Sequence, residues 1–292
     1  IHENFLPEFQ YYYAAVLVIF ILGLMDDLME LSASKKLVGQ VITASILIHL
    51  GDVRLTSMNG LFGIQELPEG FGLALSYLTI IVVINSFNLI DGVDGLASGL
   101  GIVSLLVFGT YFFAVGLQGY ALLSFALAGS LLAFLIFNHQ PARIFMGDSG
   151  SLLIGLVNAI LVIRFIKVSE MPGIAVPVPS AVAVGIAILI VPLLDTLRVF
   201  SIRMLNGRSP FSPDRNHIHH FLLDTGFSHT GVGLVCVGIN IGIILLAWWA
   251  RSLGNNIVLL AILLLAGLGY GLLYRGRSRL ARGRETGHTD EQ

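Results

Sequence analysis

Long apolar stretches alternate with short polar ones along nearly the whole chain. Nine of them come close to the length of about 20 apolar residues that a helix needs to cross a bilayer. The predicted spans cover residues 11–25, 37–50, 72–90, 96–116, 119–137, 151–168, 174–197, 230–250 and 255–274. This pattern predicts an all-α polytopic membrane protein with one transmembrane domain over residues 1–274.

Two segments have a different pattern. In the loop 51–71, short runs of strand-forming residues flank Asn59-Gly60, a frequent turn pair, so the loop is expected to form a small β-hairpin on the outer side. The tail 275–292 is basic and then polar. Its arginines are expected to fix topology and contact anionic lipid rather than bind nucleic acid.

Composition agrees with a membrane protein. Hydrophobic residues make up 55% of the chain and charged residues 12%, and the mean hydropathy is +0.87. These values exclude an ordinary soluble domain. The single cysteine, Cys236, excludes an intramolecular disulfide.

The distribution of basic residues predicts the orientation. With nine spans, twelve lysines and arginines fall on one set of loops, and only Arg54, Arg164, Lys167 and Arg251 fall on the other. The positive-inside rule assigns the first set to the cytoplasm. We therefore expect a multi-pass plasma-membrane protein whose N-terminus is outside and whose C-terminal tail is cytoplasmic.

Polar residues gather on the predicted cytoplasmic loops, near residues 26–36, 85–95, 138–150 and 198–228. Ionisable groups at the mouths of apolar spans are costly and usually functional. The candidates, in chain order, are Asp26, Asp27, Asn88, Asp91, Asp94 and Asp148, followed by a loop rich in arginine and histidine up to His220.

These residue types suit phosphoryl-group transfer. Carboxylates and a carboxamide are ligands for Mg²⁺ or Mn²⁺, and arginines with histidines suit a polyanion. Other interpretations remain open. The His-x-His-His run also suits zinc, Gly-Asp-Ser-Gly-Ser also suits a helix N-cap, and Asp195 with Arg198 also suits an intrahelical pair. A secondary transporter with carboxylates along an ion path is an alternative of another class.

The order of motifs carries a resemblance. Asp-Asp is followed by Asn-x-x-Asn-x-x-Asp-Gly-x-Asp-Gly-Leu-Ala, then Phe-Met-Gly-Asp-Ser-Gly-Ser, then Ser-Pro-Phe-Ser-Pro-Asp-Arg-x-His-Ile-His-His. This order resembles the polyprenyl-phosphate N-acetylhexosamine-1-phosphate transferases, a glycosyltransferase family 4 type. The last motif, Ser209 to His220, is most similar to the undecaprenyl-phosphate N-acetylglucosaminyl-1-phosphate transferase branch.

The resemblance implies a reaction and its partners. N-acetylglucosamine 1-phosphate would move from UDP-N-acetylglucosamine, a UDP-N-acetylhexosamine, to undecaprenyl phosphate in the bilayer. UMP would be released, Mg²⁺ or Mn²⁺ would assist, and the product would begin a cell-envelope polysaccharide. Transfer of phospho-N-acetylmuramoyl-pentapeptide is the alternative within the enzyme class. No nucleic acid is implied, and a homo-oligomer is left open.

It also implies roles for residues. Asp26, Asp27, Asp91 and Asp94 would be catalytic, and Asp148 and Asn88 would bind the metal. The substrate-binding set would be Lys36, Asn138, Arg208, Arg215, His217, His219 and His220. Direct attack by the lipid phosphate is the favoured route, and an aspartyl-phosphate intermediate is the alternative.

The chain departs from the family pattern in two ways. Glu30 stands where the family often has a further aspartate. Family members also begin with additional helices and a glycine-rich cytoplasmic motif, so the chain is expected to be an N-terminally truncated piece of a longer protein.

Overall fold

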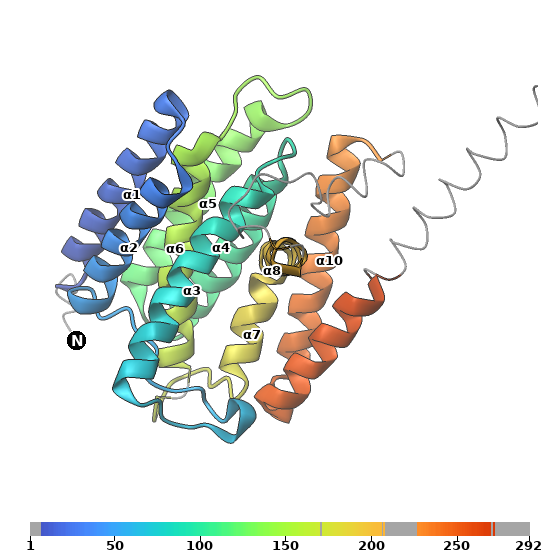
Figure 1. The fold of residues 1–292 in the computed structure, drawn as a ribbon. Coiled ribbons are helices and arrows are strands. Elements are labelled where there is room, and N and C mark those ends of the chain that lie inside the picture. The colour runs from blue at the N-terminus through green and yellow to red at the C-terminus, as the bar shows by residue number, and fades with distance from the viewer. Residues whose placement is uncertain (1–6, 170, 206, 208–226, 270, 272–292) are drawn as a thin grey trace, which may run out of the picture.

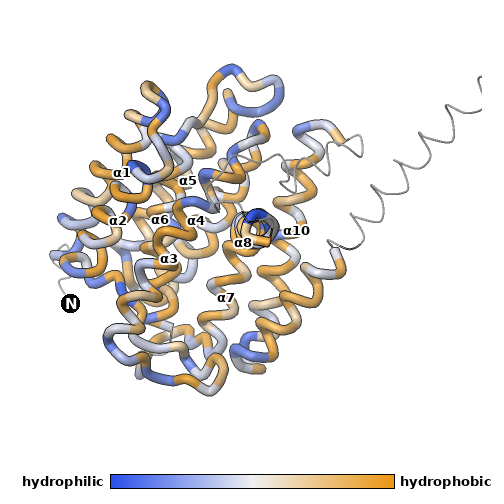
Figure 2. Tube along the Cα trace, in the orientation of Figure 1, coloured by the Kyte–Doolittle hydropathy of each residue, from blue (hydrophilic) through white to orange (hydrophobic). Residues whose placement is uncertain are grey.

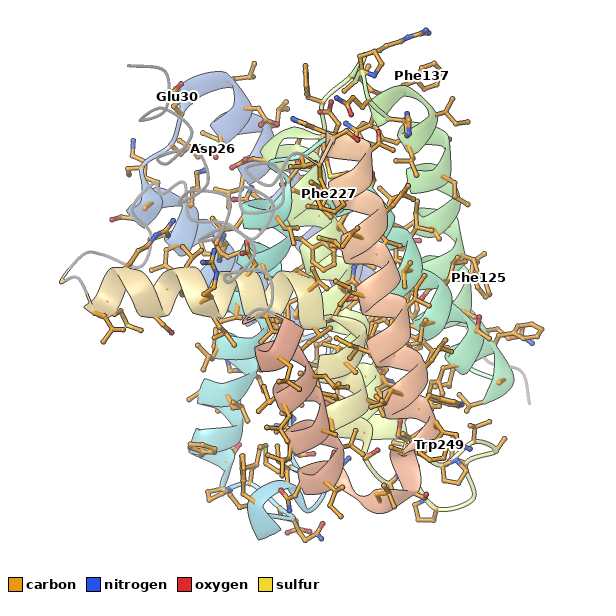
Figure 3. All side chains as sticks on the ribbon, turned by 90° about the vertical axis from the view of Figure 1, so that its right-hand side faces the viewer. Asp26, Glu30, Phe125, Phe137, Phe227 and Trp249 are labelled. Atoms are coloured by element: carbon orange, nitrogen blue, oxygen red, sulfur yellow. The ribbon has the colours of Figure 1, made fainter. Side chains whose placement is uncertain are left out.

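The computed structural model describes residues 7–169, 171–205, 207, 227–269 and 271. The helices pack side by side in a bundle, with the exception of α8, which lies across it (Figure 1; Figure 3). The α-helices are α1 (Phe9–Met29), α2 (Ala33–His49), α3 (Glu69–Ile90), α4 (Leu96–Ala114), α5 (Gln118–Asn138), α6 (Gly147–Val168), α7 (Ala181–Ile188), α8 (Ile190–Leu205), α10 (His229–Trp249) and the helix Asn255–Gly269. Two 3-10 turns, η1 (Leu61–Gly63) and η2 (Arg251–Leu253), lie in the connections.

Six of these helices are long and apolar enough to cross a membrane, namely α1, α3, α4, α5, α6 and α10. Figure 2 shows hydrophobic residues along the bodies of the helices and hydrophilic ones mainly in the loops at the two ends and on α8. The predicted class, a multi-pass helical membrane protein, is confirmed by these helices.

The prediction of nine spans is not confirmed. Among the described residues six helices qualify, or seven if α7 and α8 count as one bent span. The expected spans 37–50 and 255–274 correspond to α2, which has 17 residues, and to the shorter apolar helix Asn255–Gly269. Hydropathy detects apolar runs, but it does not measure how long a run stays helical.

The expected span 174–197 is broken, because α7 and α8 meet at an angle of 82°. Pro192 has no N–H, so it cannot bond the carbonyl of Ile188 one turn earlier. Asn240 of α10 replaces that bond. Its amide nitrogen donates to the Ile188 carbonyl at 3.1 Å, and its oxygen accepts from the Val191 amide at 3.4 Å. A side chain from another helix therefore satisfies the broken backbone.

The predicted β-hairpin in loop 51–71 is not confirmed either. The described part of the chain contains no strand, only an isolated antiparallel bridge between Ser57 and Glu66. Asn59 and Gly60 do have the positive φ values of a tight turn, 50° and 76°. The turn continues into η1, however, and Phe62 donates its N–H to the Asn256 side chain at 2.8 Å. Contacts with a helix end thus replace a strand ladder.

Helix α6 forms the centre of the bundle, where it packs against α1 and α3. Gly155 allows the close approach to α3, since a Cβ atom there would lie 2.6 Å from the Ile84 Cα atom. Small residues drive helix packing in lipid, which lacks a hydrophobic force between helices. The 22 residues of α6 form a helix about 33 Å long, enough to cross the apolar core of a bilayer.

The bundle therefore has two polar ends. We call the end where α1 and α3 finish and α6 begins the site end. The other is the opposite end, where α6 finishes. Figure 3 shows Asp26 and Trp249 at these two ends.

Candidate functional site

The first turn of α6 is held by a side chain of α1. Asp27 accepts the backbone N–H of Asp148 at 2.7 Å and that of Ser149 at 3.1 Å. These amides have no partner within their own helix, and the helix dipole favours a negative charge there. Gly147 makes room for the carboxylate, because a Cβ atom at its φ of 64° would lie 2.7 Å from an Asp27 oxygen. Asp27 thereby fixes the start of α6.

Lys36 of α2 joins two carboxylates from different helices. Its ammonium pairs with Asp26 of α1 and lies 2.8 Å from the Asp148 Oδ2 atom of α6. Asp26 is nearly buried and also accepts the Leu31 N–H at 2.6 Å, which fixes the turn after α1. The ammonium compensates two negative charges that would otherwise repel each other across the site.

Helix α3 contributes Asn88 to the same group. Its amide nitrogen donates to the Asp148 Oδ1 atom at 2.9 Å and to the Ser151 hydroxyl at 3.0 Å. Both oxygens of Asp148 are therefore engaged, one by Lys36 and one by Asn88. Four helices, α1, α2, α3 and α6, supply these contacts.

Asp91 and Asp94 lie in the turn between α3 and α4. The pKa of the Asp91 carboxyl is raised from 3.8 to about 7, first by burial and then by the negative charges of Asp148, Asp27 and Asp94. This electrostatic coupling means that Asp91 faces the same polar region as Asp148. A carboxyl of this kind changes its charge near neutral pH and is typical of functional sites.

Asn138 connects two loops at the site end. Its oxygen accepts the Gly95 N–H at 2.9 Å, and its nitrogen donates to the Ile144 carbonyl at 3.0 Å. The side chain is buried. These contacts make it a positioning residue for the turn that carries Asp94, while direct binding of substrate by Asn138 stays a prediction.

One polar pair beside the site joins a motif residue, Asn85, to a residue outside every motif, Gln40. Gln40 of α2 is buried and exchanges hydrogen bonds with Asn85 of α3, at 2.8 and 3.3 Å. Asn85 lies one turn before Asn88, so its spacing gave a signal. The sequence carries no signal for Gln40, because a single glutamine within an apolar run belongs to a site only through a partner that the structure brings to it.

Five predicted substrate-binding residues lie outside the described residues, namely Arg208, Arg215, His217, His219 and His220. The alternative of zinc on the histidines lies there too. On α8, Asp195 and Arg198 form the predicted intrahelical ion pair, with 3.5 Å between Oδ1 and a guanidinium nitrogen.

The expected Mg²⁺ site at the site end stays a prediction. The described residues include no group of three or more His, Cys, Asp or Glu side chains arranged to hold a metal ion. The site does bring together carboxylate oxygens of Asp26 and Asp148, which are Mg²⁺-type ligands, while Asn88 faces Asp148 with its NH2 group. That a cation, the Lys36 ammonium, lies between the two carboxylates shows that this position favours positive charge.

Residues 9–166 match the family described as glycosyl transferase family 4. The chain is 30% identical to the undecaprenyl-phosphate alpha-N-acetylglucosaminyl 1-phosphate transferase of Yersinia pestis, across 95% of this chain and 76% of that protein. It is 31% identical to the protein of the same name from Escherichia coli strain K12, across 77% of this chain and 61% of the relative. It is also 37% identical to the decaprenyl-phosphate N-acetylglucosaminephosphotransferase of Mycobacterium tuberculosis, across 75% of this chain and 57% of that protein. The chain thus spans less than two thirds of the length of the last two relatives.

Proposed function

The chain belongs to glycosyl transferase family 4, and on that premise we propose that it transfers N-acetylglucosamine 1-phosphate from UDP-N-acetylglucosamine to undecaprenyl phosphate. The names of the relatives support the polyprenyl-phosphate acceptor and the sugar phosphate. The product would be a diphosphate-linked lipid that begins a cell-envelope polysaccharide. The single observation that carries the proposal is the joint contact of Lys36 and Asn88 with Asp148, at the end of a spanning helix.

The proposed reaction is one displacement at phosphorus. An oxygen of the lipid phosphate bonds to the β-phosphorus of the UDP-sugar, and the bond from that phosphorus to the bridging oxygen breaks. The bridging oxygen leaves with UMP. Such a transfer needs positioning and charge compensation more than covalent help. A site at the membrane surface suits it, because one substrate is a lipid and the other is soluble.

The two neighbouring aspartates would have different roles. Asp27 is exposed, so a lipid phosphate can reach it, and we assign it to orient that phosphate and to accept its proton. Asp26 is 7% exposed and paired with Lys36, which makes it a poor proton acceptor and a good anchor for the ammonium. Lys36, which lies between Asp26 and Asp148, would also compensate the charge of a bound phosphate.

Asp148 and Asn88 would hold Mg²⁺, with Mn²⁺ as a substitute, beside the diphosphate. The metal, when bound, would compensate the charge that develops on the leaving phosphate. Asp91 and Asp94 would shape the nucleotide side of the site. The arginines and histidines up to His220 would bind phosphate and sugar, and the site would face the cytoplasm, where UDP-sugars are made.

A transfer assay tests the proposal. The full chain in lipid nanodiscs would be given undecaprenyl phosphate and UDP-N-acetylglucosamine labelled in the sugar, with Mg²⁺ or with EDTA. We expect labelled lipid and UMP in equal amounts, and loss of both with EDTA. A parallel reaction with UDP-N-acetylmuramoyl-pentapeptide should give no labelled lipid. The proposal would be overturned if only UDP-N-acetylmuramoyl-pentapeptide were used as donor, or if neither donor were used.

A further inference from the structure

A second charged cluster lies at the opposite end of α6. Lys167 donates to the Asp52 Oδ2 atom at 2.5 Å. Two guanidinium groups approach the same carboxylate, Arg54 at 3.7 Å and Arg164 at 3.9 Å. We call Arg54, Arg164 and Lys167 the cation cluster. Three positive side chains approach the one carboxylate of Asp52. Two further carboxylates lie nearby, Glu8 close to Tyr120 and Glu69 close to Arg54, but neither forms an ion pair with these cations among the described residues.

The guanidinium of Arg164 is short of hydrogen-bond acceptors. The side chain is 15% exposed, and its Nε atom is buried without a partner. Within the described part of the chain it has an ion pair at 3.9 Å and a stacking contact at 5.0 Å with the Tyr120 ring, but no hydrogen bond. A guanidinium has five N–H donors, and a buried donor without an acceptor is unfavourable. Arg164 therefore presents donors that an anion would satisfy.

The surroundings hold this guanidinium in place. Tyr120 of α5, over which it stacks, shares a hydrogen bond of 2.9 Å with the Tyr12 hydroxyl of α1, and Tyr12 donates to the Gly51 carbonyl at 3.1 Å. Asp52 follows Gly51 directly. Residues of α1, α5, α6 and the loop after α2 thus fix both the arginine and the carboxylate beside it. A preorganised cation costs less to use in binding than a mobile one.

The position of the cluster selects the ligand. Arg164 and Lys167 lie in the last turns of α6, whose 22 residues cross the bilayer core, so the cluster lies at lipid headgroup level. Arg54 and Asp52 are 45% and 41% exposed, which leaves the cluster open on one side. The dipole of α6 favours positive charge at this end, but it does not require three cations around one carboxylate.

We propose that Arg54, Arg164 and Lys167 form a binding site for a phosphate group at the membrane surface opposite the candidate active site. Guanidinium groups bind phosphate oxygens through paired hydrogen bonds, and the cation cluster provides two of them beside an ammonium. An anionic phospholipid headgroup and free inorganic phosphate share this chemistry. The headgroup is favoured by the location, since its acyl chains would lie along the apolar bodies of the neighbouring helices.

Native mass spectrometry of the full chain, released from micelles that contain phosphatidylglycerol or phosphatidylcholine, tests the site. Wild type should retain more phosphatidylglycerol than phosphatidylcholine. Arg54→Gln and Arg164→Gln should each lower the retained phosphatidylglycerol about tenfold, a loss typical of one charge-assisted contact. Arg251→Gln is the matched control. Arg251 lies at the same end but outside the cluster, and it donates to the Trp248 carbonyl at 2.8 Å. It should retain the wild-type amount.

Thermal unfolding with inorganic phosphate separates the two sources. In one outcome, inorganic phosphate raises the Tm of wild type but not of Arg164→Gln, and the two lipids are retained equally. This result would support the proposed site, with free phosphate as its ligand. Equal retention of both lipids together with no effect of phosphate would overturn the proposal. So would a lower Tm in Arg164→Gln with unchanged lipid retention, because the cluster would then only be structural. Arg54→Gln keeps the test valid if Arg164→Gln does not fold, since Arg54 is the more exposed residue.

Discussion

The two ends of α6 carry charge clusters of opposite composition. At the site end, Asp26 and Asp148 share one cation, Lys36. At the opposite end, three cations share one carboxylate, Asp52. The first cluster combines residues from α1, α2 and α6, whereas the second combines the end of α6 with the loop after α2. Asp148 and Lys167 are 19 residues apart on α6, so the two clusters are separated by about 28 Å along this helix.

The helix dipole explains part of this arrangement. Negative groups are favoured at the start of a helix and positive groups near its end, which agrees with Asp27 and Asp148 at one end and Lys167 at the other. The effect is worth about 0.3–1 kcal/mol per group, too little to gather several like charges. The dipole alone therefore does not account for either cluster, which agrees with the proposed cation site at one end and the proposed phosphate site at the other. Four predictions test this contrast, from the largest effect to the smallest.

Removing one carboxylate at each end should have very different effects on turnover. Asp148→Asn should lower the transfer rate about 10³-fold, because a neutral amide binds Mg²⁺ weakly and leaves diphosphate charge uncompensated. Asp52→Asn should leave the rate unchanged. Initial rates of the transfer assay with both variants in nanodiscs check this. Similar losses in both would show that the two clusters do not differ in function.

Asp27→Asn should lower the rate about 10²-fold, since it removes the group assigned to accept the proton. The amide still has an oxygen for the N–H of Asp148, so the Tm should fall only slightly. Glu30→Gln is the control, because Glu30 is an exposed carboxylate in the turn after the same helix. A variant Asp27→Asn with the wild-type rate would remove Asp27 from the site.

The single opposite charge in each cluster should also differ in importance. Lys36→Met should lower the Tm in EDTA by more than Asp52→Asn does, because it leaves Asp148 unpaired beside the nearly buried Asp26. Added Mg²⁺ should restore the Tm of Lys36→Met. Unfolding scans with EDTA and with Mg²⁺ measure both effects.

The neighbouring Lys35 provides the control for this experiment. It is exposed and makes no ion pair among the described residues, so Lys35→Met should match wild type. If Mg²⁺ does not raise the Tm of Lys36→Met, the ammonium does not occupy a position that suits a metal.

The pH dependence of stability should arise at the site end. The pKa of Asp91 is about 7 in the folded state, above its ordinary value of 3.8, so the folded state binds the extra proton. The stabilisation is present at low pH and is lost as the pH rises through about 7, with a slope of at most about 1.4 kcal/mol per pH unit. Unfolding in EDTA between pH 5 and 8 should show this loss in wild type. Asp91→Asn should flatten it, and an unchanged slope in that variant would contradict the assignment.

The sequence alone was sufficient for the class of protein and for the family. Apolar runs near 20 residues identify spanning helices, because a bilayer requires that length. The motifs with Asp26-Asp27, Asn88 and Asp148 were each recognisable by residue type and spacing. Their positions at the ends of predicted spans were also sufficient to expect them at one membrane surface.

Only the tertiary structure decided how these elements bend and which partners they have. Pro192 was visible in the sequence, but the break between α7 and α8 is satisfied by Asn240, a residue of another helix that hydropathy along residues 174–197 could not reveal. The turn at Asn59 did not become a hairpin because its neighbour Phe62 bonds Asn256, almost 200 residues away. Lys36 and Asp148 are 112 residues apart in the chain, yet their side chains are in contact. Local patterns fix what a segment prefers, whereas long-range contacts fix which charges meet, and the sequence pattern carries no record of those distances.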